Sequence, residues 1–78
     1  MNDWSDKLKN LTKTQAYAGA MMKNLKGEFG MIKTRTDSKI IIVETELDPK
    51  IMWPMPTDKE IASFNNVEEM IKDGWVID

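Results

Sequence analysis

The chain has 78 residues, a mass of 9.0 kDa, a hydrophobic content of 41% and a net charge of -2, which together predict one folded domain over residues 1–78. It contains no cysteine and no histidine, which excludes disulfides, thiolate nucleophiles, the usual neutral-pH general base and the preferred zinc ligands. The N-terminal stretch MNDWSDKLKN carries acids where a signal peptide has a basic region, and the apolar runs AYAGAMM and IIIV are too short to span a bilayer. We therefore expect a cytoplasmic protein without a membrane segment.

Charge is distributed unevenly along the chain. Residues 1–39 contain eight basic and four acidic side chains, whereas residues 40–78 contain three basic and nine acidic ones. Such asymmetry predicts electrostatic steering of a partner, unless the two halves neutralise each other within the fold.

The first expected element is an amphipathic helix from about residue 4 to residue 26, capped by Asp3 and stopped by Gly27. Its stripe has alternating spacings of four and three residues and consists of Trp4, Leu8, Leu11, Gln15, Ala18, Met22 and Leu25. This spacing, with polar Gln15 at its centre, also predicts self-association, most simply as a homodimer. A capping box of Thr12 and Gln15 favours the alternative that the helix breaks near Thr12.

A hairpin is expected over residues 28–47, because EFGMIKTRT and KIIIVETEL are rich in β-branched residues and flank the turn sequence TDSK. The consecutive apolar residues at positions 40–43 predict a central strand that is buried on both faces. Glu44 and Glu46 follow on one face, so the far end of this strand is expected to be acidic and solvated.

The segment DPKIMWPMPTD holds all three prolines. Pro49 is expected to turn the chain, and Pro54 and Pro56 are expected to end any sheet ladder. Residues 58–64 fit either a helix that begins with a Thr57 and Glu60 capping box or a strand, and we favour the strand. Asn66 with Glu69 predicts a helix over residues 67–73, followed by a C-terminal strand. The predicted class is α+β: an N-terminal amphipathic helix, a small antiparallel sheet made of the hairpin and short later strands, and a second short helix.

Catalytic and metal chemistry have little support in the sequence. Glu44, Glu46 and Asp48 could offer carboxylates to a hard cation, but no EF-hand spacing or second ligand cluster accompanies them. The glycines form no phosphate-binding pattern. We expect no metal, no other cofactor and no enzymatic activity, and we interpret the three acids as a solvated strand end.

The strongest candidate for binding is the proline-framed loop at residues 49–56. Tryptophan and methionine are enriched in interface cores, and prolines limit the entropy that a loop loses on docking. The alternative is that Ile51, Met52 and Trp53 fold back over the sheet. The residues predicted to bind a partner are Met52, Trp53, Met55, Glu44, Glu46, Glu68 and Glu69.

We therefore predict a non-enzymatic module that binds a host or cellular protein of unknown identity. It is expected to act as an inhibitor or adaptor by occluding that protein. Small chains without histidine or cysteine are frequent among phage-encoded inhibitors, and we expect a protein of that type. The alternative is a nucleic-acid-binding protein that uses its basic N-terminal half. The basic residues in question are Lys7, Lys9, Lys13, Lys33 and Arg35.

Overall fold

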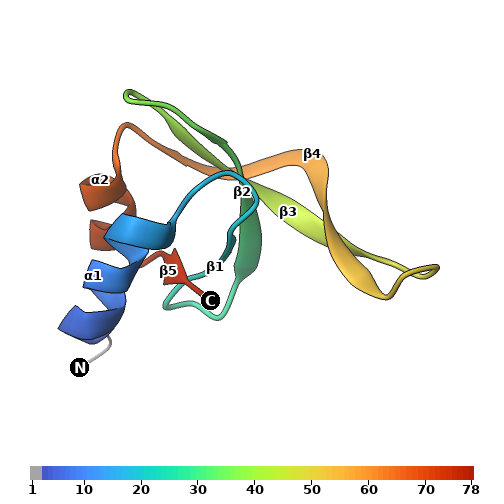
Figure 1. Cartoon of the computed structure of the whole chain (residues 1–78), viewed down its shortest axis with the longest axis horizontal. Helices are drawn as coiled ribbons and strands as arrows, with labels where there is room; N and C mark the ends of the chain where they lie inside the picture. The colour runs from blue at the N-terminus through green and yellow to red at the C-terminus, as the bar shows by residue number, and fades with distance from the viewer. Residues whose placement is uncertain (1–2) are drawn as a thin grey trace.

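The computed structural model describes residues 3–78 and has an α+β fold, as predicted (Figure 1). In chain order the elements are α1 (Asp6–Gln15), β1 (Met21–Lys23), β2 (Phe29–Arg35), β3 (Ile40–Asp48), β4 (Trp53–Phe64), α2 (Val67–Lys72) and β5 (Val76–Ile77). The strands form one antiparallel sheet in the order β4-β3-β2-β1-β5.

The first helix is shorter than the sequence pattern predicts, because α1 ends at Gln15 rather than near residue 26. Its N-cap is Ser5, whose hydroxyl accepts a hydrogen bond from the backbone N–H of Leu8, and not Asp3. The chain then turns at Gly19, which has a φ of 94°. Met22 is buried as predicted, but in β1, which pairs with β2 and β5 on its two sides. The expected stripe is therefore not one helix face, and self-association loses that structural basis.

The alternative of a break near Thr12 is wrong as well, because Thr12 lies inside α1 and is fully buried. Its hydroxyl donates a hydrogen bond to the carbonyl of Leu8 (2.8 Å) and accepts one from the backbone N–H of Ile77 (3.0 Å). A threonine that is a poor helix former by propensity thus joins α1 to β5.

The hairpin is confirmed as β2 and β3, with the backbone N–H of Thr36 bonded to the carbonyl of Lys39 across the turn (2.8 Å). The prediction of a central strand is confirmed too, since β3 lies between β2 and β4. Ile40, Ile42 and Val43 are all buried.

The later strands are not all short, which corrects the prediction that the prolines end the ladder. β4 begins at Trp53 and continues to Phe64, so the favoured strand at residues 58–64 is confirmed as part of a longer one. Pro54 pairs with Leu47, and Pro56 pairs with Thr45. This is compatible with proline because β4 is an edge strand, in which alternate backbone nitrogens point away from the sheet.

The second helix begins and ends as its capping residues predict. The side chain of Asn66 accepts a hydrogen bond from the backbone N–H of Glu69 (2.8 Å). At the other end, Gly74 has a φ of 104° and the backbone N–H of Trp75 reaches the carbonyl of Met70 (3.1 Å), which is a Schellman closure.

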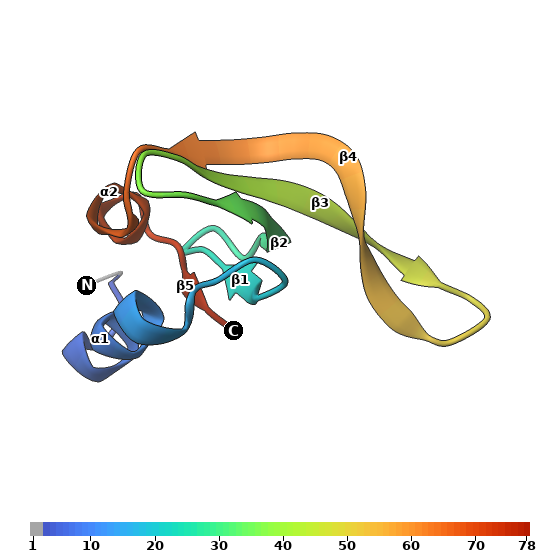
Figure 2. The same cartoon turned by 45° about the horizontal axis from the view of Figure 1, so that its top comes forward.

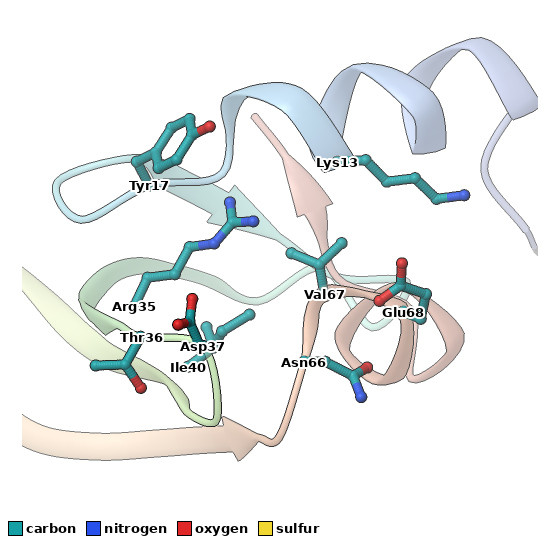
Figure 3. A pocket seen from close by; sticks show the side chains of 9 residues that line it. All are labelled: Lys13, Tyr17, Arg35, Thr36, Asp37, Ile40, Asn66, Val67 and Glu68. Atoms are coloured by element: carbon teal, nitrogen blue, oxygen red, sulfur yellow. The ribbon is translucent and has the colours of Figure 1, made fainter.

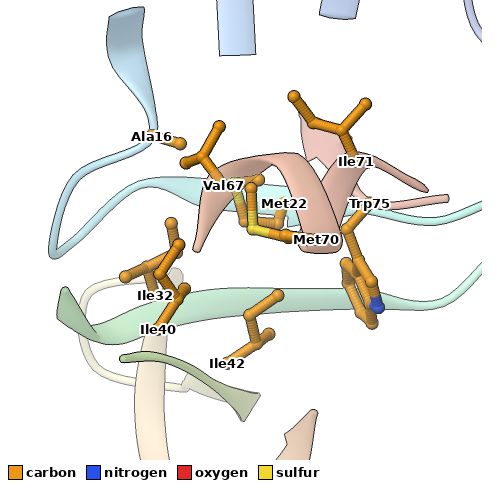
Figure 4. Packing of buried hydrophobic residues seen from close by; sticks show 9 residues of the cluster. All are labelled: Ala16, Met22, Ile32, Ile40, Ile42, Val67, Met70, Ile71 and Trp75. Carbon is orange, nitrogen blue, oxygen red and sulfur yellow. The ribbon is translucent and has the colours of Figure 1, made fainter. Parts of the chain in front are cut away.

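The hydrophobic core lies at the end of the molecule that carries the two helices (Figures 1 and 4). Side chains of β2 and β3 point toward α2 there (Figure 4). The buried cluster consists of Ala16, Met22, Ile32, Ile40, Ile42, Val67, Met70, Ile71 and Trp75. The opposite end is the far part of the β3–β4 hairpin, which projects from the body and gives the molecule extents of 37 × 28 × 19 Å (Figure 2).

Candidate protein-binding arm

The projecting part of the hairpin, residues 44–57, is here called the arm. The pairing of β3 with β2 ends at Val43, whereas its pairing with β4 continues to the last pair, Asp48 with Trp53. The β3–β4 register shifts twice between Ile42 and Thr45, and such irregularities bend and twist a strand. The arm is therefore a two-stranded ribbon that leaves the body at an irregular point (Figure 2).

Large apolar side chains are concentrated on the arm. It is less than a fifth of the chain, yet it holds five of the ten exposed large apolar residues found among residues 3–78. These five, here called the apolar tip, are Leu47 (54% exposed), Ile51 (60%), Met52 (68%), Trp53 (63%) and Met55 (44%). A local concentration of exposed apolar side chains is typical of interaction sites in folded proteins.

The strand register determines which side chains share a face of the arm. Trp53 lies opposite Asp48 and Met55 lies opposite Glu46, so these four side chains project from one face. The other face carries Leu47, Pro54 and Pro56. Each face thus presents apolar groups. The high exposure of Ile51, Met52 and Trp53 shows that these residues do not fold back over the sheet.

Local hydrogen bonds hold the turn at the end of the arm. The side chain of Asp48 accepts a hydrogen bond from the backbone N–H of Lys50 (2.8 Å). The backbone carbonyl of Asp48 accepts one from the backbone N–H of Met52 (2.7 Å). Met52 has a φ of 54°, a left-handed conformation that costs about 1–2 kcal/mol in a residue with a side chain. Two local hydrogen bonds, one of them to the Asp48 side chain, therefore hold the turn, while the side chains of Ile51 and Met52 are exposed.

The four predicted glutamates do not form one surface. Glu44 and Glu46 belong to the arm, and the carboxylate of Glu44 lies 3.5 Å from the ammonium group of Lys59. Glu68 and Glu69 belong to α2, at the opposite end of the molecule (Figures 1 and 2). The Glu69 carboxylate also has a structural contact there, because it accepts a hydrogen bond from a backbone N–H just before the helix. The arm thus brings together five of the seven predicted residues.

Several basic side chains of the N-terminal half have partners within the fold. The ammonium group of Lys9 lies 2.5 Å from a carboxylate oxygen of Asp3. This hydrogen bond and ion pair, together with a hydrogen bond from the backbone N–H of Trp4, hold the pKa of Asp3 below its ordinary value. Lys33 lies 3.2 Å from Asp58. The Arg35 guanidinium donates to a backbone carbonyl and stacks over the Tyr17 ring. The ion pairs of Lys9 and Lys33 reduce the positive potential that a phosphate would meet, and the contacts of Arg35 fix its side chain within the fold.

A hollow of about 420 Å³ lies between the end of α1, the β2–β3 turn and the start of α2 (Figure 3). Its lining mixes both signs of charge, because Arg35 and Asp37 lie at one end of the hollow and Lys13 and Glu68 lie at the other (Figure 3). Arg35 is already bonded to the carbonyl of Ala16. Within residues 3–78 no three acidic side chains are arranged to hold a metal ion.

Sequence reasoning missed two features of the arm. Leu47 belongs to the apolar tip, and the β3 edge beyond Val43 has no neighbouring strand in the described part of the chain. The alternation Glu-Thr-Glu-Leu predicted a half-exposed strand end, but the length of β2, and hence where the edge becomes free, depends on tertiary structure.

Comparison of the chain with protein-family models, with curated proteins and with solved structures finds no match. Within residues 3–78, neither helix has the length and apolar character needed to cross a membrane.

Proposed function

We propose that the chain is a non-enzymatic protein-binding module that docks on another protein through the apolar tip. The observation that carries this proposal is the concentration of exposed Leu, Ile, Met and Trp side chains on a hairpin that projects from the body. The body has its own core at the other end, so burial of the tip is not needed to complete that core.

The physical features of the arm favour docking. Tryptophan and methionine contribute large contact areas, and methionine adapts its flexible side chain to the shape of a partner. Pro54 and Pro56 fix the backbone beside Trp53 and Met55, which lowers the entropy lost on binding. A projecting arm of this kind can enter a groove of its partner while the body stays outside. Such a protein acts as an inhibitor when it occludes the groove, and as an adaptor when its body is recognised in turn.

Affinity capture tests this function directly. The wild-type chain, the double variant Trp53→Ala with Met55→Ala, and the control Phe29→Ala are used as baits in one cell lysate, with and without nuclease. Phe29 is 55% exposed but lies in β2, outside the arm. We expect a protein that is retained by the wild type and the control, resists nuclease, and is lost with the double variant.

Two results would contradict the proposal. Equal capture by all three baits would show that the tip is not the docking surface. Recovery of nucleic acid, lost on nuclease treatment and unaffected by the double substitution, would support the alternative that the basic half binds phosphates.

A further inference from the structure

We propose that the free edge of β3 in the arm binds an extended segment of the partner as an added antiparallel strand, and that this segment carries a basic side chain at every second position. The inference rests on the proposed function, because it names the kind of partner segment that the arm recognises. Addition of a strand to an exposed sheet edge is a common mode of peptide recognition, in which backbone hydrogen bonds supply affinity and alternate side chains supply specificity.

The prolines determine which backbone groups point to this edge. Because proline has no N–H, Pro54 and Pro56 can pair with Leu47 and Thr45 only as non-hydrogen-bonded pairs. In such pairs the backbone N–H and carbonyl groups of both residues point away from the partner strand. Thr45 and Leu47 therefore direct their donors and acceptors outward from β3.

Two hydrogen bonds confirm this alternation. The carbonyl of Glu44 accepts a hydrogen bond from the hydroxyl of Thr57 (2.9 Å), on the side of β4. The carbonyl of Asp48 accepts one from the backbone of Met52, in the turn that leads to β4. The backbone N–H and carbonyl groups of Glu44, Glu46 and Asp48 thus point toward β4. Those of Thr45 and Leu47 point toward the free edge.

The two edges of the arm differ in their capacity to accept a strand. The outer edge of β4 carries Pro54 and Pro56, whose missing N–H groups prevent a continuous ladder. The β3 edge has no proline between Val43 and Asp48, and no strand of residues 3–78 pairs with it there. Strand addition is therefore directed to one side of the arm.

The acidic side chains of β3 determine which kind of partner segment fits at the free edge. Glu44, Glu46 and Asp48 alternate along β3 and share one face, so an added strand places every second side chain beside a carboxylate. Lysine or arginine at those positions is complementary, and Glu46 has no ion-pair partner among residues 3–78. The intervening positions lie beside Thr45 and Leu47 and favour apolar or β-branched residues.

The same carboxylates disfavour a second copy of this chain at the edge. In an antiparallel pair about a two-fold axis, Glu46 lies opposite its own copy and Glu44 lies opposite Asp48 of the other copy. All six carboxylates would then share one face, and like charges that lie opposite each other destabilise a strand pair.

The test uses a synthetic peptide of alternating lysine and valine, mixed with the full chain and followed by NMR. When the lysines lie beside the carboxylates, the valines lie opposite Thr45 and Leu47. The backbone N–H groups of these valines then point toward β3. We expect binding to slow hydrogen exchange at the amides of Thr45 and Leu47. Methylation of the valine amide nitrogens should weaken binding by about tenfold or more, because the inward donors are lost, whereas methylation of the lysine amides should leave it nearly unchanged.

A variant of the protein supplies an independent readout. Thr45→Pro removes an outward N–H without removing a β3–β4 hydrogen bond, and Thr45→Val keeps that N–H as the control. Peptide binding should be lost with Thr45→Pro and kept with Thr45→Val. The inference is overturned if the peptide fails to bind, if the two methylation patterns have equal effects, or if Thr45→Pro binds as well as Thr45→Val. Capture that still depends on Trp53 in those cases would leave the proposed function standing.

Discussion

At the scale of single residues, Gly30 shows how closely β2 packs against β3. A Cβ atom on Gly30 would lie 2.6 Å from the Cγ2 of Ile42 and 2.9 Å from the carbonyl oxygen of Val43. The second of these atoms belongs to the backbone and cannot move aside. The close approach occurs where the register of β3 becomes irregular, just before the arm begins.

Gly30→Ala is therefore expected to destabilise the fold by about 1–3 kcal/mol, the usual cost of overpacking a core. Urea denaturation followed by circular dichroism measures the free energy of unfolding. Ser63→Ala, an exposed substitution on β4, is the control and should change little. Equal urea midpoints for Gly30→Ala and the wild type would contradict this prediction. They would show that β2 and β3 can move apart here without loss of stability.

The hydroxyl of Thr12 gives a second prediction at this scale. Thr12→Val keeps the shape of the side chain but leaves the backbone N–H of Ile77 without its partner, which should cost about 1–3 kcal/mol of stability. The matched control is Thr14→Val, whose hydroxyl bonds only to the carbonyl of Leu11 on the exposed side of α1. The prediction fails if both valine variants unfold at the same urea concentration.

At the scale of elements, local signals predicted where strands and helices exist better than where they end. The β2–β3 turn and the start and stop of α2 depend on adjacent residues, and the sequence predicted them. The end of α1 depends on β1 being bound between β2 and β5, and a buried Met22 satisfies a helix period and a strand equally well. The length of β4 depends on its being an edge strand, which no local pattern encodes.

The edge prolines lead to a prediction about β4. Pro54→Val with Pro56→Val restores two outward N–H groups and creates a continuous strand edge, so we expect the fold to persist and self-association to increase. Sedimentation velocity at several protein concentrations measures the change. Pro49→Ala, in the turn, is the control. A double variant that sediments like the wild type would show that the prolines do not protect this edge.

At the scale of the whole molecule, the chain consists of a packed body and an arm without a core of its own. Isolated two-stranded ribbons have marginal stability in water, so the arm depends on the body and on its local turn for order. The composition predicted one small domain, the order of the expected elements predicted its α+β class, and the loop at residues 49–56 was predicted to bind. The separation of Glu44 and Glu46 from Glu68 and Glu69 was not predictable, because it depends on the direction in which the hairpin leaves the body.

Rates of amide hydrogen exchange should differ between the arm and the body. Amides of the arm that bond across β3 and β4, such as that of Glu46, are expected to exchange through local opening, faster than the amides of Ile42 and Val76 in the body. NMR exchange rates at one pH measure the difference. Uniform protection along the whole of β3 would mean that the arm opens only when the body unfolds.

The central claim is that Trp53 and Met55 serve binding and not folding. The most direct measurement compares the wild type with the double variant Trp53→Ala and Met55→Ala, both for affinity toward the captured partner by calorimetry and for unfolding in urea. Because both side chains are exposed in the isolated chain, we predict an affinity weaker by about 2 kcal/mol or more with a nearly unchanged free energy of unfolding. A double variant that binds as tightly as the wild type, or one that unfolds, would contradict the claim.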